Sequence, residues 1–250
     1  MIEISAEIQN DISFHQAMAV AELLTFCSKG DIVFKSKPID TEGISIEHFT
    51  APMNRIIMGE NPANGIRFLR DCGILEKFIP ELSRCSGIKQ NPKYHIDNIF
   101  EHCVKVCSLV KQDLKLRWAG LLHDIGKYEA KNITEKAGET FHKHEVFGEK
   151  STRNIMARLG ITGQLEEEIV FLVRNHMYHY DRKWTDKTVW KFILKTGLNN
   201  SGIIDIGEMP LFLLRRADRA SRGLTPISQK QMDFEARLIS VFNKNSEREF

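Results

Sequence analysis

The feature that most limits the fold of this chain is the spacing of its apolar residues. They recur at intervals of three and four residues through nearly the whole sequence, and convincing alternation with a period of two is absent. Because an α-helix has 3.6 residues per turn, this spacing puts apolar side chains on one face of successive helices. Hydrophobic residues make up 42% of the 250, enough to bury a core. We therefore predict an all-α fold.

Glycine, proline and polar residues separate the predicted helices. The loop GIKQNPKYHID divides the chain into a smaller helical region, residues 1–88, and a larger helical bundle, residues 89–250. Asp97 is expected to be the N-cap of the first helix of the bundle. Residues 131–140 are predicted to form a polar loop. The predicted helices cover residues 14–27, 46–58, 63–72, 74–82, 97–111, 114–127, 146–159, 165–177, 187–196, 207–222 and 228–242.

Bulk composition excludes several classes of protein. The net charge is only +2, so no overall nucleic-acid footprint is expected, although a local basic patch is compatible with it. No apolar run approaches the ~20 residues that span a bilayer, and the acidic, polar start MIEISAEIQNDIS is unlike a secretory signal. We expect a cytoplasmic protein without membrane contact. The five cysteines form no CxxC pair, so neither a disulfide framework nor a zinc knuckle is indicated.

Four predicted helices carry an imidazole or a carboxylate on their apolar stripe. His102 lies between Ile99 and Val106 in the helical repeat, and His123, His176 and Asp218 occupy equivalent inward positions. A buried carboxylate without a partner costs several kcal/mol. One divalent metal would satisfy these groups together, because imidazole nitrogen and carboxylate oxygen are common metal ligands.

Each of these residues also has a simpler interpretation. A single histidine on an apolar face is more often a core residue than a ligand, and Asp218 can pair with Arg215 or Arg222 on its own helix. The adjacent pair His123 and Asp124, followed by a glycine and a lysine, favours the metal site. The ligand set expected from this pattern is His102, His123, Asp124 and Asp218.

At HDIGK the sequence resembles the HD superfamily of metal-dependent phosphohydrolases. The pattern of that superfamily is an upstream histidine, a His-Asp doublet and a distant aspartate, here His102, His123 with Asp124, and Asp218. The resemblance implies an HD-domain helical bundle. It also implies that His144 and His176 bind a second metal, as in binuclear members.

A narrower resemblance links the chain to the C-terminal half of bacterial tRNA nucleotidyltransferases, the CCA-adding enzymes. It rests on MNRIIMGENPANGIRFLRDCGILEKFIPEL, GIKQNPKYHIDNIFEH, LRWAGLLHDIGK, TFHKHEVFGEKS and ISIEHF. The first 88 residues then correspond to the neck and body of those enzymes. The Gly-Ser motif and paired aspartates of their nucleotidyltransferase head are absent from these 250 residues, so CCA addition is not expected. The resemblance implies phosphodiesterase activity on 2′,3′-cyclic nucleotides, with phosphatase and 2′-nucleotidase activity beside it.

Residues close to the expected metal ligands are predicted to take part in catalysis or substrate binding. We expect His123, Asp124 and Lys127 to be catalytic, and Lys127, His95 and Arg215 to contact substrate. Lys127 has an equally good interpretation as a cation at the C-terminal end of a helix. His142 and His179 are alternatives to the second pair of histidines. The expected cofactor is one or two divalent ions among Mg, Mn, Ni, Co, Fe and Zn, because no thiolate narrows the choice.

The principal alternative is an RNA-binding or partner-binding module without catalysis. It would dock on tRNA or on a separate nucleotidyltransferase subunit. Its basic residues would be Arg55, Arg67, Arg70, Lys77, Arg84 and Lys89. Two further alternatives are a hydrolase of guanosine tetraphosphate or deoxynucleoside triphosphates, and a remnant of a transferase gene. The enzyme interpretation predicts a nucleotide or the 3′ end of an RNA as substrate.

Overall fold

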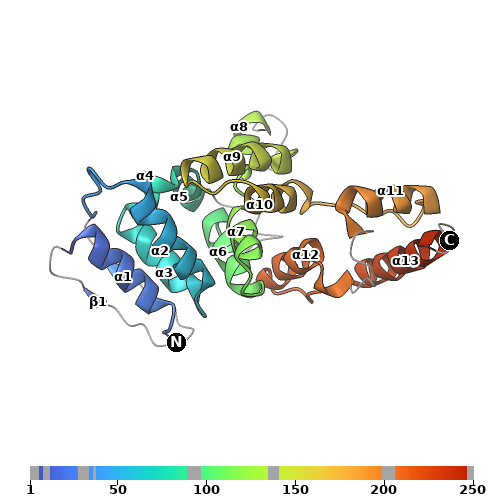
Figure 1. The fold of residues 1–250 in the computed structure, drawn as a ribbon, viewed down its shortest axis with the longest axis horizontal. Helices are drawn as coiled ribbons and strands as arrows, with labels where there is room; N and C mark the ends of the chain where they lie inside the picture. The colour runs from blue at the N-terminus through green and yellow to red at the C-terminus, as the bar shows by residue number, and fades with distance from the viewer. Residues whose placement is uncertain are drawn as a thin grey trace.

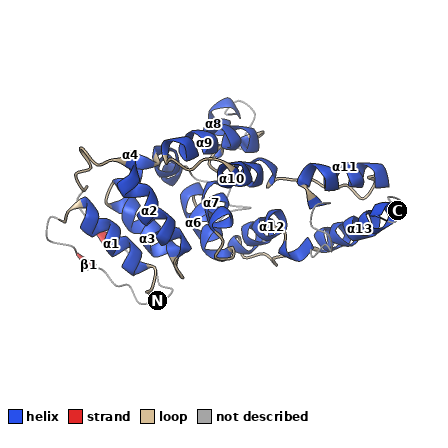
Figure 2. Cartoon of the chain, in the orientation of Figure 1, coloured by secondary structure: helices blue, strands red, loops and turns tan. Residues whose placement is uncertain are grey.

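The computed structural model describes residues 6–7, 12–27, 34–35, 38–88, 97–134, 141–198 and 206–246. Within these ranges the chain forms α-helices, short 3-10 helices and one pair of two-residue strands (Figure 2). The strands β1 (Ala6–Glu7) and β2 (Phe34–Lys35) pair in parallel, with Ala6 opposite Phe34. The predicted all-α class is confirmed.

The N-terminal region consists of helices with recognisable end signals. Ser13 and Gln16 form a capping box in front of the first helix. That helix ends at Leu24, three residues earlier than predicted, because the Thr25 backbone N–H and hydroxyl both bond back to the Glu22 carbonyl. The helices are α1 (Phe14–Leu24), α2 (Ile46–Met58), α3 (Pro62–Asp71), α4 (Ile74–Phe78) and α5 (Pro80–Arg84), followed by η1 (Cys85–Gly87).

The helices of the larger region carry the candidate site. They are α6 (Ile99–Leu109), α7 (Leu114–Leu122), α8 (Lys127–Thr134), α9 (His144–Arg158), α10 (Gln164–Asn175), α11 (Asp186–Thr196), η3 (Ile206–Glu208), α12 (Pro210–Ser221) and α13 (Gln229–Ser246). Three predictions were wrong. Asn98, and not Asp97, is the N-cap of α6, because its side chain accepts the backbone N–H of Glu101. The helix predicted over residues 114–127 stops at Leu122, and α8 occupies part of the expected 131–140 loop.

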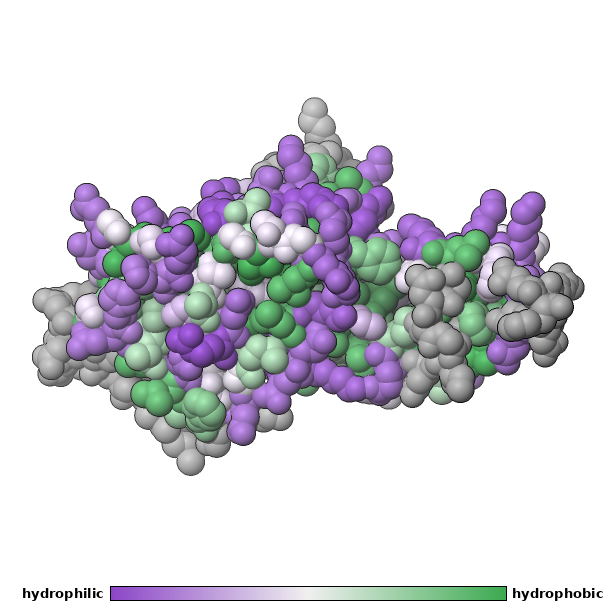
Figure 3. All heavy atoms as spheres, in the orientation of Figure 1, coloured by the Kyte–Doolittle hydropathy of each residue, from purple (hydrophilic) through white to green (hydrophobic). Residues whose placement is uncertain are grey.

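The helices form an elongated molecule (Figure 1). Its buried apolar side chains fall into two clusters. The first cluster joins α1–α5 to α6, α7, α9 and α10. The second joins another face of α6, α7 and α10 to α11, α12 and α13. Figure 3 shows polar residues spread over one face of the molecule, with hydrophobic residues visible between them. The helices α6, α7 and α10 therefore belong to both clusters, and the candidate site is built on them.

The N-terminal helices pack directly on the larger region. Buried Trp118 on α7 donates its indole N–H to Asn54 Oδ1 on α2, at 2.8 Å. On α6, Glu101 accepts from Arg67 and Arg70 of α3 at 2.7 to 2.9 Å. These contacts tie the two predicted regions into a continuous packed structure. The domain boundary at residue 88 stays a prediction.

Candidate metal centre

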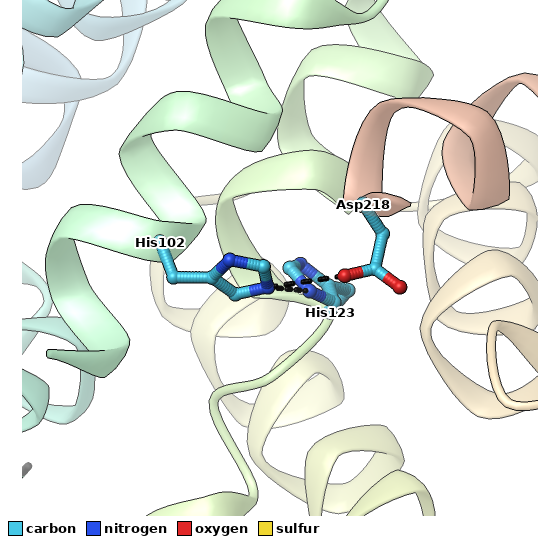
Figure 4. Close-up of side chains that lie close together, drawn as sticks. All are labelled: His102, His123 and Asp218. Atoms are coloured by element: carbon cyan, nitrogen blue, oxygen red, sulfur yellow. Dashed lines mark hydrogen bonds and ion pairs between the residues drawn. The ribbon is translucent and has the colours of Figure 1, made fainter. Parts of the chain in front are cut away.

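Three donor atoms meet where α6, the end of α7 and α12 come together (Figure 4). The Nε2 atoms of His102 and His123 are 3.2 Å apart, and Asp218 Oδ1 lies 3.2 Å from His102 Nε2. All three side chains are buried. We call these residues the first group. Their donor atoms lie within 4.8 Å of one another, which is close enough for one metal ion to bind all three.

A second group of donors consists of Asp124, His144 and His176. His144 is the first residue of α9, and His176 directly follows α10. Their Nε2 atoms are 3.1 Å apart, and Asp124 Oδ1 lies 3.2 Å from His144 Nε2 and 3.6 Å from His176 Nε2. These residues are also buried, and their donors also lie within 4.8 Å of one another.

The carboxylate of Asp124 contacts both groups. Its Oδ2 atom lies 3.3 Å from the Nε2 atoms of His102 and His123, whereas Oδ1 faces the second group. A carboxylate that directs one oxygen to each of two ligand sets has the arrangement needed to bridge two metal ions.

The turn after α7 brings the two groups together. Residues 123–126 form this turn, and a Cβ at Gly126 would lie 2.1 Å from the His144 carbonyl oxygen and 2.3 Å from the Gly148 nitrogen. Only glycine allows the turn to pack this closely against α9. On the α9 side, Lys143 has a φ of 61°, a conformation uncommon for a residue with a side chain. Backbone strain of this kind often accompanies a functional site.

Backbone carbonyls fix the tautomers of three histidines. The Nδ1 atoms of His123, His144 and His176 lie 2.9, 2.8 and 2.7 Å from the carbonyl oxygens of Gly120, Phe141 and Val173, respectively. A carbonyl oxygen can only accept, so each Nδ1 must carry the proton. In the neutral imidazole the lone pair is then on Nε2, the atom directed into the groups. A histidine whose other nitrogen donates to a carbonyl is the usual arrangement of a metal ligand.

The fourth histidine is oriented by a serine hydroxyl. Ser221 Oγ donates to the Asp218 carbonyl oxygen at 2.7 Å, so it has no proton left for His102. His102 Nδ1, 3.1 Å away, must therefore donate to Ser221 Oγ, and its Nε2 also presents a lone pair. The sequence analysis did not find Ser221, three residues after Asp218, because a helical serine has no distinctive signal.

Lone pairs from four imidazoles thus converge with two carboxylates. Two neutral Nε2 atoms that are both acceptors cannot hydrogen-bond to each other, although the pairs lie only 3.1 and 3.2 Å apart. The two lone pairs of each such pair repel each other, and positive charge between them, from a proton or a metal ion, relieves this repulsion. The donors present therefore fit a divalent metal.

The two carboxylates are held in their charged form. Burial by itself would raise the pKa of Asp124, but the Lys127 ammonium and the neighbouring histidines hold it well below its usual range. Burial opposes ionisation of Asp218 too, yet hydrogen bonding with His102 and the nearby charges lower its pKa. Ionised carboxylates are the form that binds metal.

The histidine pKa values move in different directions. Burial would lower the pKa of His102, but its bonds with Asp124 and Asp218 raise it above the usual value. The pKa of His144 is raised by Asp124 in the same way, against burial. Burial lowers the pKa of His176 below its usual value, in spite of its bond with Asp124.

Lys127 is the first residue of α8 and lies inside the site. Its Nζ atom is 2.6 Å from Asp124 Oδ2, and both residues are buried. The interpretation of Lys127 as a cation at a helix C-terminus was wrong, because the helix before it ends at Leu122.

Two arginines in and directly after α12 lie near Asp218. Arg215 lies at the site, with Nη1 3.4 Å from the His176 carbonyl oxygen and 4.0 Å from Asp218 Oδ2. Arg222 pairs with Asp218 Oδ2 at 3.0 Å, as the alternative interpretation of Asp218 expected. Asp218 therefore contacts both an arginine and the histidine of the first group.

The remaining histidine predictions can now be placed. His142 and His179 are exposed and belong to neither group of donors, so the structure favours His144 and His176 over them. His95 lies outside the described residues.

Carboxylates pair with three of the six basic residues of the proposed RNA-facing surface. Arg55 pairs with Glu22 at 2.9 Å, and Arg67 and Arg70 both pair with Glu101. These side chains offer less positive charge to RNA than their number in the sequence suggested.

Comparisons with known proteins agree with the motif. The sequence model of the HD domain matches residues 99–242, more than half of the chain. An A-adding tRNA nucleotidyltransferase of Deinococcus radiodurans is 33% identical over 131 residues, which are 50% of this chain and 30% of that protein. The multifunctional CCA protein of Azoarcus sp. is 35% identical over 127 residues, 49% of this chain and 30% of the relative. The multifunctional CCA protein of Pseudomonas aeruginosa PAO1 is 29% identical over 148 residues, which are 57% of this chain and 35% of that protein.

The matched part of the chain thus covers about a third of the length of these curated relatives. The predicted resemblance to the HD superfamily and to tRNA nucleotidyltransferases is confirmed. Within the described residues, no helix combines the length and the apolar character needed to cross a membrane.

Proposed function

Because the chain belongs to the HD domain family, we propose that it is a metal-dependent phosphohydrolase and phosphodiesterase. Its proposed substrates are nucleotides or RNA 3′ ends, with 2′,3′-cyclic phosphates as the leading class. The observation that carries the proposal is the convergence of four Nε2 lone pairs on Asp124 and Asp218. Such a site can bind divalent cations, which are the usual means of hydrolysing phosphate esters.

We assign the first group, together with Asp124 Oδ2, to one ion. Asp124 Oδ1, His144 and His176 would hold a second. Imidazole-rich sets of this kind favour transition ions over Mg, which prefers oxygen ligands and keeps much of its water. The chemistry that a bound divalent ion supplies is activation of water near neutral pH and withdrawal of charge from phosphoryl oxygens.

The other residues of the site stabilise charge on Asp124, bind phosphoryl oxygens or orient a metal ligand. Lys127 keeps Asp124 ionised through their 2.6 Å contact, and its ammonium can also bind a phosphoryl oxygen at the edge of the site. The guanidinium of Arg215, beside Asp218, is placed to bind a second phosphoryl oxygen. Ser221 positions His102 by accepting a hydrogen bond from its Nδ1–H.

Turnover of 2′,3′-cyclic AMP tests the proposal. Metal-stripped protein would be assayed with Mg, Mn, Fe, Co, Ni and Zn in turn, with 2′-AMP and a generic phosphatase substrate alongside. We expect activity to return with a transition ion and to fall by more than about a hundredfold in Asp124→Asn, which keeps the shape but not the charge. Exposed His142→Ala is the control and should retain activity. A folded protein that binds metal but hydrolyses none of these substrates would contradict the proposal.

The alternative, a tRNA-binding or partner-binding module without catalysis, has weaker support. The names of the relatives connect them with tRNA, but the arginines on α2 and α3 are occupied by carboxylates here. This alternative predicts salt-sensitive tRNA binding that survives Asp124→Asn. A separate nucleotidyltransferase subunit and a cytoplasmic location stay predictions.

A further inference from the structure

A cluster of cations lies beside the first group, where α12 meets the start of α13. Arg215 and Arg219 are four residues apart and share a face of α12. Together with Lys230, Ser228 and Gln231, they line a cavity of about 100 Å³. A space of that size holds several waters, and it is large enough for a tetrahedral oxyanion.

These cations have few carboxylates near them. Arg216 on the same helix pairs with Glu235 at 2.8 Å, and Arg222, which follows the helix directly, pairs with Asp218 at 3.0 Å. Arg219 instead donates to the Thr225 carbonyl oxygen at 3.1 Å. Among the residues the structure describes, no carboxylate lies within 4.0 Å of Arg219 or Lys230. An anion bound in the cavity would therefore meet positive charge that is not already neutralised.

Arg215 connects this cavity to the candidate metal centre. Its nearest carboxylate oxygen is Asp218 Oδ2, at 4.0 Å, and Arg222 lies closer to that oxygen. Its guanidinium also contacts the His176 carbonyl and lies 5.7 Å from the centroid of the Tyr178 ring, which lines the same cavity. A single guanidinium thus borders both the first group and the cavity.

We propose that this cavity binds a second phosphate of the substrate, carried on the 5′ oxygen of the nucleoside whose 2′,3′-phosphate lies at the metal groups. The inference rests on the proposed function. Two guanidinium groups, an ammonium and a hydroxyl form a donor set suited to phosphate. A nucleoside phosphorylated at its 2′ and 3′ oxygens has one further position for a phosphate, the 5′ oxygen. In an RNA 3′ end this is the last internucleotide phosphate, and in a mononucleotide it is a 5′-phosphate.

Selectivity between matched substrates tests this inference. The substrates are adenosine 2′,3′-cyclic phosphate, the same compound with a 5′-phosphate, and a dinucleotide that ends in a 2′,3′-cyclic phosphate. We expect the native protein to prefer the two 5′-linked substrates by about tenfold or more in kcat/KM, mainly through KM. In Arg219→Gln and Lys230→Gln this ratio should fall toward one. Lys230 is exposed, so its substitution leaves packing intact.

Arg153→Gln is the matched control, because it removes one positive charge from a partly exposed arginine paired with Glu167 on another part of the surface. It should leave the ratio unchanged. A preference for the dinucleotide over the 5′-phosphorylated mononucleotide would identify RNA ends as the source of the phosphate. A preference for the 5′-phosphorylated mononucleotide would identify mononucleotides. A native ratio near one, or a ratio that Arg219→Gln does not change, would overturn the inference.

Binding distinguishes failure of the inference from failure of the proposed function. Adenosine 2′,5′-bisphosphate and adenosine 2′-monophosphate would be titrated calorimetrically in the presence of EDTA. A tenfold tighter affinity for the bisphosphate, lost in Arg219→Gln, would support the phosphate site even if no substrate is hydrolysed. Equal affinities for the two compounds would refute it whether or not the protein hydrolyses cyclic phosphates.

Discussion

Replacing Lys127 with methionine should destabilise the metal-free protein far more than the metal-bound protein. The Lys127 and Asp124 side chains are 8% and 4% exposed, and they meet at 2.6 Å. Removing one partner of a buried pair costs about 3–5 kcal/mol, because the other charge is left uncompensated. For a chain of this size each kcal/mol lowers Tm by about 2–4 °C, so the expected loss is roughly 6–20 °C. In the presence of metal the loss should be much smaller, because the ion supplies positive charge to the same carboxylate.

A more exposed pair of equal length provides the control. Lys105 lies 2.6 Å from Asp97, but these side chains are 41% and 22% exposed. An exposed pair contributes about 0–1 kcal/mol, so Lys105→Met should shift Tm by at most about 4 °C, with or without metal. Calorimetric unfolding of both variants, in EDTA and in Mn²⁺, measures the four values. The reasoning is refuted if Lys127→Met is no more destabilising in EDTA than Lys105→Met, or if metal does not reduce its effect.

Three further predictions concern ligand choice, pH and thiols. His144→Ala should lose at least one bound metal ion, whereas His142→Ala, two residues away and exposed, should bind metal normally by elemental analysis. Because the pKa values of His102 and His144 are raised, protons occupy their nitrogens up to a higher pH. Calorimetric metal affinity should therefore fall as pH drops through that range, by about tenfold per pH unit for each proton displaced. Metal affinity that is flat between pH 8 and 5.5 would contradict this. Among the five cysteines only Cys27 is exposed, so the native protein should show one thiol reactive to a disulfide reagent at pH 8, and the denatured protein five.

Most of the helices could be predicted from apolar spacing, because that spacing reflects which face is buried. Their ends were less predictable, since end positions depend on contacts made elsewhere in the fold. Residues 114–127 read as one helix, yet the chain turns after Leu122 so that Gly126 can pack against Gly148 of α9. Nothing in the local sequence indicates that distant contact.

The candidate site, like the helices, could be predicted only in part from the sequence. Inward positions in the helical repeat predicted that His102, His176 and Asp218 would be buried, and they are. Inward spacing and the adjacent His-Asp pair favoured His102 and Asp218 as ligands. His144 and His176 were assigned as ligands only through the resemblance to a family. The roles of Ser221 and of the carbonyls that fix the tautomers depend on contacts in the folded structure that the sequence does not reveal.

The central claim is that Asp124 joins two metal-binding groups, and the number of Mn²⁺ ions bound per chain tests it most directly. Isothermal titration of metal-stripped protein should give two ions for the native chain. Asp218 belongs only to the first group, so Asp218→Asn should leave one bound ion. The two carboxylate oxygens of Asp124 face both groups, so Asp124→Asn should lose both ions. Circular dichroism would verify that each variant is folded. If folded Asp124→Asn still binds two ions, or if the native chain binds none, the account is wrong.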